Sequence, residues 1–287
     1  MPHQILTSAK SAMLKEYKDH VEERLQQGIP PLPLNAEQVA DLVELLKSPP
    51  AGEEEFILDL IKNRTPAGVD PAAYVKAAFL TALAKGETSS PLIDKKLATE
   101  LLGTMLGGYN VESLIKLLKD EEVGAIAADG LSKTLLMFNA KHEVIELAAE
   151  NENAKRVVES WSNGEWFTSK SKLPEVIKAI VFRVDGEINT DDFSPAQDAP
   201  SRPDIPLHAL AMLKKNMEDP IGTIEKLKES GLPVVFVGDV VGTGSSRKSA
   251  TNSLLWHIGE DIPFIPNKRQ AGICIGCLLY TSDAADE

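Results

Sequence analysis

Cysteine is scarce in this sequence: only Cys274 and Cys277 occur among its 287 residues. Two cysteines are too few for a disulfide framework, and their scarcity is typical of a reducing compartment. The sequence also lacks any apolar stretch near the ~20 residues that span a bilayer. Its first residues, MPHQILTSAKSA, lack the apolar centre of a secretory signal. We therefore expect a cytoplasmic protein with no membrane partner.

Basic residues are also in deficit, with 30 Lys and Arg against 43 Asp and Glu, a formal net charge of −13. Such a chain repels a phosphate backbone or an anionic membrane on average, which argues against non-specific binding to either. Any anion site must therefore be local. The composition, 43% hydrophobic and 25% charged, is ordinary for a globular protein, and the length predicts about two domains.

Residues 13–167 have the apolar spacing of consecutive helices, with Pro or Gly at the breaks. Asn35 is an expected N-cap, and Asp70 is another, with Pro71 as the first helical residue. Short helices joined by short turns predict an all-α helical-repeat array. The expected helices cover residues 13–28, 36–47, 53–64, 70–86, 94–105, 110–120, 123–138 and 142–151.

The pattern changes after Trp166, which places a domain boundary near residues 168–172. A β-branched run from Val176 to Val184 predicts a strand, and VVFVGDVV (residues 234–241) predicts another. Alternating strands and helices predict an α/β domain whose sheet is at least partly parallel. The other expected elements are helices at 207–217, 222–231 and 250–259 and short strands at 261–266 and 272–276.

The segment GTGSSRKS, which follows the second strand, matches neither common phosphate motif. A Walker A loop needs glycine directly before Lys248-Ser249, where Arg247 stands. The dinucleotide fingerprint needs a third glycine after Gly242 and Gly244, and Arg247 occupies that place as well. The backbone and side-chain groups of the loop, rather than a known motif, therefore indicate which ligand it could bind.

A strand that rises into a glycine-rich turn and opens a helix presents backbone N–H groups and the positive end of a helix dipole to one point. Ser245 and Ser246 add hydroxyl donors, and Arg247 adds a planar fork suited to a carboxylate. A carboxylate is as natural a ligand here as a phosphate. The alternative is structural: the glycines make a tight turn, the serines cap the helix, and Arg247 and Lys248 are solvated.

The strand, the Gly-x-Gly-Ser-Ser-Arg loop and the helix together resemble the swivelling domain of the aconitase superfamily. GEINTDDFSPA (186–196) is similar to the Thr-Asp segment that begins this domain, and PSRPDIPLHALAML (200–213) to its arginine-bearing segment. SPPAGEEEF and GTMLGGYNV are similar to the HEAT-like domain of the bacterial-type aconitase B family, which places that domain first. The resemblance covers residues 13–276.

The resemblance implies a role for each matching residue. Ser245 is the expected catalytic base, which takes a proton from the carbon beside a substrate carboxylate. Ser245, Ser246 and Arg247 are expected to bind substrate, with Arg202 as a second clamp; without the resemblance, Arg202 would be interpreted as a surface arginine. Thr190, Asp191, Gly242 and Gly244 are expected to support the site. Asp192 departs from the Thr-Asp-His form of other aconitases, and no role is carried onto it.

The resemblance also implies a hydro-lyase that isomerises citrate and isocitrate through cis-aconitate, or acts on 2-methylisocitrate. Its [4Fe-4S] cluster would be bound by three cysteines of domains absent from this chain. Cys274 and Cys277 form only half of a metal motif, so no metal site is expected here. His208 and His257 are interpreted as structural histidines rather than ligands.

The expected organisation is an N-terminal extension (1–12), a HEAT-like domain (13–167), an incomplete swivelling domain (173–277) and an artefactual tail (278–287). We expect such a fragment to be inactive alone. The alternative is a free-standing interaction or dimerisation module with a carboxylate-binding loop. A homodimer through the helical domain and RNA binding follow from the resemblance only, since the sequence has no RNA-binding motif or basic stripe.

Overall fold

The computed structural model describes residues 2–134 and 140–276, with side chains from Ala12 onward. The chain divides into two compact units. The helical unit consists of the residues up to His20, Pro33–Lys172 and Pro263–Pro266. The α/β unit consists of Val21–Leu32, Leu173–Ile262 and the described residues from Asn267. Within the described ranges, no helix combines the length and apolarity that crossing a membrane requires.

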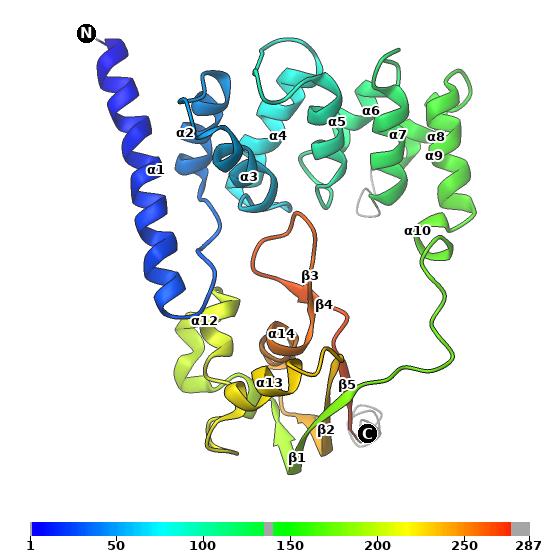
Figure 1. Ribbon diagram of the computed structural model, residues 1–287. Coiled ribbons are helices and arrows are strands. Elements are labelled where there is room, and N and C mark those ends of the chain that lie inside the picture. Colours follow the sequence, from blue (N-terminus) through cyan, green and yellow to red (C-terminus); the bar gives the residue numbers. More distant parts are fainter. Residues whose placement is uncertain (1, 135–139, 277–287) are drawn as a thin grey trace. The chain divides into compact units, whose positions relative to one another are not determined.

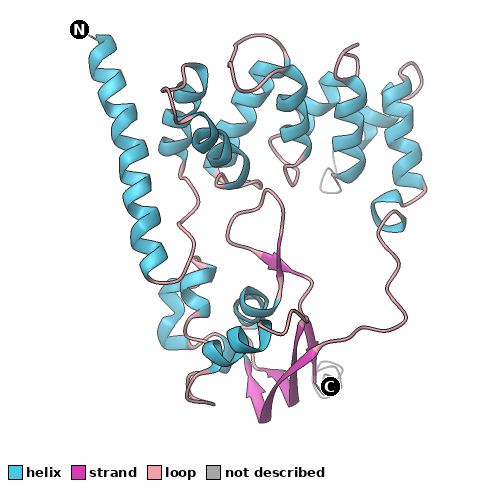
Figure 2. Ribbon diagram, in the orientation of Figure 1, coloured by secondary structure: helices cyan, strands magenta, loops and turns pink. Residues whose placement is uncertain are grey.

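The amino-terminal part of the chain is helical, as its apolar spacing predicts (Figures 1 and 2). The long helix α1 contributes to both units, because His20 belongs to one and Val21 to the other. The helices are α1 (Pro2–Gln26), α2 (Ala36–Lys47), α3 (Glu54–Asn63), α4 (Pro71–Ala84), α5 (Lys95–Gly103), α6 (Val111–Leu117), α7 (Gly124–Lys133), α8 (Lys141–Leu147), α9 (Glu152–Ser162) and α10 (Glu165–Thr168).

Capping side chains fix where these helices begin. The Asn35 side chain accepts from Gln38 N and the Gln38 side chain accepts from Asn35 N, which is a capping box. Asp70 accepts from Ala72 N at 2.8 Å, with Pro71 in the first turn. Both predicted caps are confirmed. The predicted helix over 123–138 ends at Lys133, and its residues 135–138 lie outside the described residues.

The α/β unit contains a parallel sheet with helices packed against it (Figure 2). Its larger elements are strand β1 (Ile180–Asn189), helix α11 (Thr190–Phe193), a 3-10 helix (Ala196–Ser201), helices α12 (Ile205–Ala209) and α13 (Pro220–Lys228), strand β2 (Val234–Thr243) and helix α14 (Arg247–Ile258). Three short strands follow: β3 (Glu260–Asp261), β4 (Arg269–Gln270) and β5 (Ile273–Ile275).

The sheet has the order β1-β2-β5, and both pairings are parallel. Phe182 and Phe236 are register partners, and their rings pack edge to face with centroids 5.9 Å apart. Phe193 of α11 adds a second edge-to-face contact with Phe236 at 5.1 Å. These three aromatic residues belong to the unit's hydrophobic core. The predicted class, an all-α domain followed by an α/β domain, is confirmed.

Three predicted elements of this unit differ from the structure by more than a few residues. Strand β1 begins at Ile180 rather than Val176, whose side chain is exposed. The helix predicted over 207–217 ends at Ala209, because the Leu213 N–H bonds Asp192 O and Leu213 adopts a φ of 59°. The strand predicted over 261–266 is reduced to Asp261, since proline cannot donate to a ladder.

Candidate functional site

The candidate site lies where strands β1 and β2 end. The two strands are parallel, so their carboxyl ends meet at one edge of the sheet. Asn189 and Thr243 are the last register partners. Thr190 therefore follows one strand beside Gly244, which follows the other. Crevices outside the carboxyl ends of parallel strands are common ligand sites in α/β folds.

Gly244 is required both by its backbone conformation and by a close approach. Its φ is +105°, a region that residues with a side chain rarely adopt, and a Cβ placed there would lie 2.5 Å from Thr190 Oγ1. Thr190 is buried, and its Oγ1 accepts from Ser246 N at 3.2 Å. Gly242 also has a positive φ, +88°, but open space around it. The loop is thus built closely onto Thr190.

The turn after β1 is a capped helix start. Asn189 Oδ1 accepts from Asp191 N at 2.7 Å and Asp192 N at 3.0 Å, and Asp192 Oδ2 accepts from Asn189 N at 2.8 Å. Asp192 therefore has a structural role as a cap. Asp191 is exposed beside it. Its side chain makes no hydrogen bond or ion pair within the part of the chain described here.

Helix α14 begins directly after the glycine loop. Ser245 and Arg247 are both exposed, and within residues 12–134 and 140–276 their side chains make no hydrogen bond or ion pair. The first-turn N–H groups of this 12-residue helix have no intrahelical acceptor, so they carry partial positive charge. A hydroxyl, a guanidinium and several N–H donors thus share one helix start, the arrangement that the sequence predicted for an anion.

Arg202 is held at the same loop. Its guanidinium donates from Nη2 to Ser246 Oγ at 3.3 Å and to Ser194 O at 3.3 Å, and from Nε to Ser194 Oγ at 3.2 Å. Arg202 precedes α12 and is only partly exposed. The structure therefore brings a second arginine to the start of α14, where it is partly exposed and bonded to Ser194 and Ser246.

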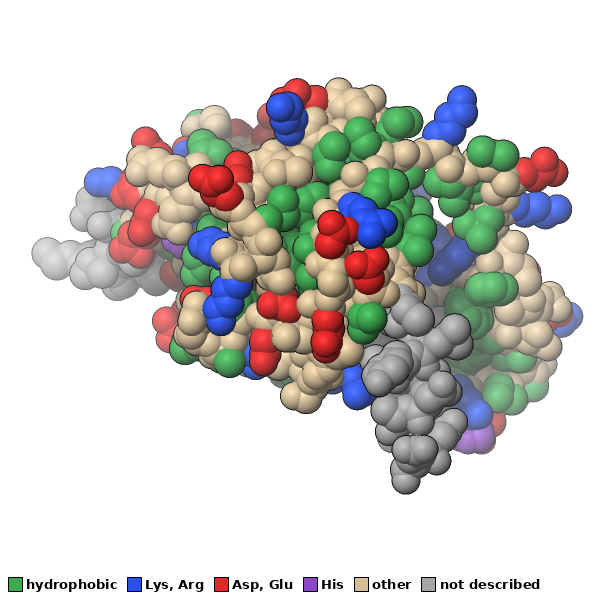
Figure 3. Space-filling model, turned by 90° about the horizontal axis from the view of Figure 1, so that it is seen from below, with side chains coloured by type: hydrophobic (Ala, Val, Ile, Leu, Met, Phe, Trp, Pro, Cys, Tyr) green, Lys and Arg blue, Asp and Glu red, His purple; other side chains and the backbone are tan. Residues whose placement is uncertain are grey.

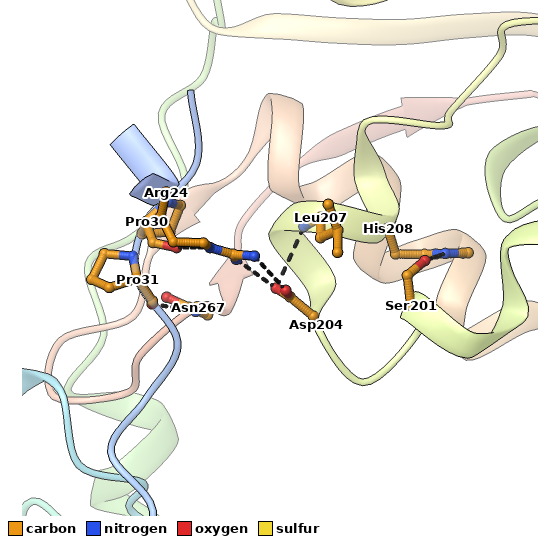
Figure 4. Close-up of polar contacts among 8 residues, drawn as sticks. All are labelled: Arg24, Pro30, Pro31, Ser201, Asp204, Leu207, His208 and Asn267. Atoms are coloured by element: carbon orange, nitrogen blue, oxygen red, sulfur yellow. Dashed lines mark hydrogen bonds and ion pairs between the residues drawn. The ribbon is translucent and has the colours of Figure 1, made fainter. Parts of the chain in front are cut away.

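The two histidines are buried by helix packing, as expected of structural residues. His208 is 2% exposed, and its Nε2 lies 2.7 Å from Ser194 Oγ. Its Nδ1 lies 2.8 Å from Ser201 Oγ (Figure 4). His257 on α14 donates from Nε2 to Ala209 O at 2.9 Å. Burial lowers the pKa of both imidazoles, so both are neutral near pH 7.

Sequence reasoning missed two serines that connect these groups. Ser194 Oγ lies 2.8 Å from Ser249 Oγ, and Ser249 Oγ lies 3.2 Å from Ser246 O. The two serines are 55 positions apart in the sequence. A single serine in a loop or helix carries no pattern, so only the folded structure shows that they meet.

The described residues do not fit a metal centre. They contain no group of three or more His, Cys, Asp or Glu side chains that could hold a metal ion. Burial raises the pKa of the Cys274 thiol, which disfavours the thiolate that metals prefer. Cys277 lies outside the described residues. These residues are thus unsuited to an iron–sulfur cluster.

A parallel α/β unit with a Gly-Ser-Ser-Arg loop at its carboxyl edge, preceded by an all-α unit, defines a two-domain protein with a candidate anion site in its second domain. The family description "Aconitate B N-terminal domain" matches residues 16–167, and "Aconitate hydratase 2 N-terminus" matches residues 179–280. The chain belongs to the aconitase B family, whose members are iron–sulfur proteins.

Curated relatives named aconitate hydratase B agree with this assignment. The chain is 61% identical to the protein of Pseudomonas aeruginosa over 275 residues, 92% of this chain and 32% of the relative. It is 59% identical to the Escherichia coli protein over 275 residues, with the same coverage, and 58% identical to that of Synechocystis over 266 residues, 92% of the chain and 31% of the relative. It thus spans about a third of the length of these relatives.

Proposed function

We propose that this chain is the amino-terminal part of an aconitate hydratase, a hydro-lyase that isomerises citrate and isocitrate through cis-aconitate. The observation that carries the proposal is the Arg202 Nη2 contact with Ser246 Oγ at 3.3 Å, beside the exposed Arg247 at the start of α14. A tricarboxylate needs several cationic groups around one point, and two arginines with a helix start meet that need.

Each loop residue has its own task in the proposal. Arg247 and Arg202 bind substrate carboxylates, with Ser246 between them. Ser245 accepts the proton from the carbon beside a carboxylate. A serine hydroxyl is a poor base in water, so its deprotonated form needs stabilisation by positive partial charge. The first-turn N–H groups of α14 and the Arg247 guanidinium supply that charge. Thr190, Asp191, Gly242 and Gly244 support the loop.

The remaining parts of the site lie elsewhere in this proposal. We assign the [4Fe-4S] cluster and the removal of the substrate hydroxyl to domains absent from this chain. The choice between isocitrate and 2-methylisocitrate belongs to the same domains. We place the protein in the cytoplasm, in line with its few cysteines. Acting alone, the 287-residue chain has a weak carboxylate site and no activity.

Citrate binding to the purified chain tests this site. We expect citrate to perturb the backbone amide resonances of residues 244–247, because these residues form the loop and helix start at which the anion would bind. Arg202→Gln and Arg247→Gln should each weaken binding by about tenfold or more, since a hydrogen bond to a charged group contributes about 1.5–3 kcal/mol. Lys248→Gln, next to Arg247 and also exposed, is the matched control and should change binding much less.

Two outcomes contradict the proposal. Citrate that leaves residues 244–247 unperturbed at high millimolar concentration removes the tricarboxylate site, and phosphate binding there without citrate binding converts it into a phosphate site. Activity provides a separate check on the fragment. Ultraviolet detection of cis-aconitate formed from citrate by this chain, with no added protein, would overturn the claim that further domains are needed.

A second candidate function is association through the helical unit, favoured by exposed apolar side chains there. Tyr74 and Tyr109 pack edge to face with ring centroids 5.1 Å apart, yet are 59% and 38% exposed, and Val69 beside them is 76% exposed. We propose a homodimer through this patch as the alternative role. Sedimentation across concentration tests it: a concentration-dependent dimer that Tyr74→Asp abolishes supports it, and a monomer throughout contradicts it.

RNA binding rests only on the resemblance to related enzymes. The face in Figure 3 carries acidic and basic side chains next to one another, with hydrophobic side chains between them. The net charge of −13 gives a phosphate backbone no general attraction. We therefore expect no complex in a gel-shift titration of the chain with RNA at physiological salt.

A further inference from the structure

A chain of hydrogen bonds connects Arg202 to the buried His208. The Arg202 Nε–H donates to Ser194 Oγ at 3.2 Å, and Ser194 Oγ lies 2.7 Å from His208 Nε2. On the other side of the ring, Nδ1 lies 2.8 Å from Ser201 Oγ and 3.1 Å from Asp198 O. Both ring nitrogens are therefore engaged, and the position of the ring proton decides the direction of the chain.

The Asp198 carbonyl fixes that proton. A carbonyl oxygen only accepts, so the nitrogen facing it must carry the hydrogen. The Ser201 hydroxyl donates its own proton to the same Asp198 O at 2.7 Å, which leaves the Ser201 oxygen free to accept as well. Both partners of Nδ1 thus require a donor. His208 is therefore the Nδ1–H tautomer, and its Nε2 is a bare acceptor.

The bare Nε2 in turn orients Ser194. The Ser194 hydroxyl has one proton, and it donates that proton to Nε2 because the bare nitrogen can only accept. The Ser249 hydroxyl, 2.8 Å from Ser194 Oγ, can donate, so in this arrangement it is the donor of the Ser194–Ser249 bond. The lone pairs of Ser194 Oγ then face the Arg202 Nε–H, and the Ser194 backbone carbonyl accepts from Nη2 at 3.3 Å. The guanidinium is held at two points, with its remaining Nη2 contact directed at Ser246 Oγ at 3.3 Å.

We propose that His208 is a positioning residue: its neutral Nδ1–H form orients Ser194 so that Arg202 is held at the anion loop beside Ser246. The inference rests on the proposed function in one respect, namely that Arg202 binds a substrate carboxylate. His208 would not touch substrate. Its role is to make the Ser194 oxygen an acceptor aimed at Arg202, which preorganises the guanidinium before an anion arrives.

The surroundings of His208 favour this neutral form. Burial lowers its pKa, the hydrogen bond to Asp198 O opposes that effect, and the nearby positive charge of Arg202 lowers the pKa further. The negative charge of Asp198 raises the pKa, as its carbonyl does, but it is the smallest of these effects. The charges near the start of α12 are Asp204 and Arg24, which are paired with each other. Helix α14, packed against α12, contributes Ser249 to Ser194 and His257 to Ala209 O.

Nuclear magnetic resonance on the 287-residue chain tests the proposal without a ligand. At pH 7 we expect the nitrogen shifts of His208 to show a protonated Nδ1 and a bare Nε2, and Arg202 to show a slowly exchanging Nε–H. Ser194→Ala should speed that exchange by about tenfold, the loss of one hydrogen bond, while the His208 tautomer stays unchanged. His257→Gln, a change at a buried histidine outside the chain of bonds, should leave the Arg202 signal in place.

Substitution of His208 separates positioning from packing. His208→Gln can place an amide oxygen where Nε2 lies, so it should retain a protected Arg202 Nε–H within about threefold of the wild-type rate; His208→Phe keeps the ring volume without an acceptor and should lose about tenfold. If His208→Phe does not fold, Ser194→Ala together with the His208 tautomer still tests whether Ser194 holds Arg202 as proposed.

An Nε2–H tautomer of His208, or an Arg202 Nε–H that exchanges equally slowly in Ser194→Ala, would overturn the inference. Absence of citrate binding in the wild-type chain would instead refute the proposed function, since neither the tautomer nor the exchange rate depends on citrate.

Discussion

Arg24 and Asp204 form a two-point ion pair although they are 180 positions apart in the sequence (Figure 4). The Nη1–Oδ2 distance is 2.7 Å and the Nη2–Oδ1 distance is 2.9 Å, with side chains only 6% and 15% exposed. Arg24 Nε also donates to Pro30 O at 2.9 Å, and Asn267 Nδ2 donates to Pro31 O at 3.0 Å. Residues 21–32 are thereby attached to the α/β unit.

Removal of one partner of this pair should destabilise the α/β unit strongly. Arg24→Met leaves the Asp204 carboxylate buried without its counter-charge, and loss of one partner of a buried pair typically costs about 3–5 kcal/mol. We expect a lower urea midpoint for the unfolding of this unit. The variant Arg24→Met/Asp204→Leu should recover much of the loss, because it buries no unpaired charge.

An exposed ion pair provides the comparison. Lys18 and Glu53 are 2.6 Å apart with side chains 46% and 29% exposed. Lys18→Met should cost about 1 kcal/mol or less, the usual contribution of a surface pair. Equal effects of Arg24→Met and Lys18→Met would show that the Arg24 pair contributes nothing from its burial.

Lys76 should make the helical unit more stable at alkaline pH. Its side chain is fully buried with one long contact, Nζ to Lys62 O at 3.5 Å, and burial lowers its pKa from 10.5 to about 8. Between pH 8 and 10.5, Lys76 therefore binds more protons in the unfolded chain than in the folded one. The free energy of unfolding should therefore rise between pH 8 and 10.5, by about 3 kcal/mol in total.

Lys76→Met should remove this rise and increase stability at pH 7, where the wild-type chain buries a charge. Denaturant unfolding of the helical unit at several pH values measures both effects. Lys96→Met, an exposed substitution on α5, should leave the pH dependence intact. A Lys76→Met profile as steep as that of the wild-type chain would exclude Lys76 as the source.

Gly244 and Gly242 should differ in their tolerance of a methyl group. Gly242→Ala meets only the cost of a positive φ, about 1–2 kcal/mol. Gly244→Ala also brings a Cβ to 2.5 Å from Thr190 Oγ1, so it should cost about 1–3 kcal/mol more, as overpacking does. In a Thr190→Ala background the two substitutions should become nearly equal in urea unfolding. A persistent difference there would assign the extra cost to another contact.

His257 should contribute to acid sensitivity of the α/β unit. Burial lowers its pKa below 6.5, so the unfolded chain binds more protons once the pH falls below that value, and stability is lost. His257→Gln keeps a donor for Ala209 O and stays neutral. It should lose less stability between pH 7 and 5 than the wild-type chain. His142→Gln, an exposed change, should match the wild-type chain throughout.

Local pattern was sufficient for much of this fold. The Asn35 and Asp70 caps and the apolar spacing between them determine helix starts within a few residues, so they could be predicted. The parallel sheet followed from the alternation of strands and helices. The helix predicted over 207–217 failed because a tertiary bond, Leu213 N to Asp192 O, competes with the local helical pattern.

Part of the candidate site could also be predicted from the sequence, and part could not. Glycines, serines and Arg247 in one short segment predict an anion loop by themselves, whereas Arg202 was assigned to the site only through resemblance. The contacts of Ser194 with Arg202, His208 and Ser249 join segments that share no sequence pattern. The same holds for Arg24 and Asp204. The catalytic and binding roles of these residues, and the domain limits at 13–167 and 173–277, stay predictions.

The passage of the chain from one unit to the other and back limits how it can be dissected. Val21–Leu32 belong to the α/β unit, although Pro33–Lys172 of the helical unit follow them. A gene fragment that starts at Leu173 would encode Asp204 without Arg24. One cut in the sequence therefore cannot isolate an intact α/β unit. A stable truncated version would need residues 21–32 restored, either fused through a new linker or supplied as a separate peptide.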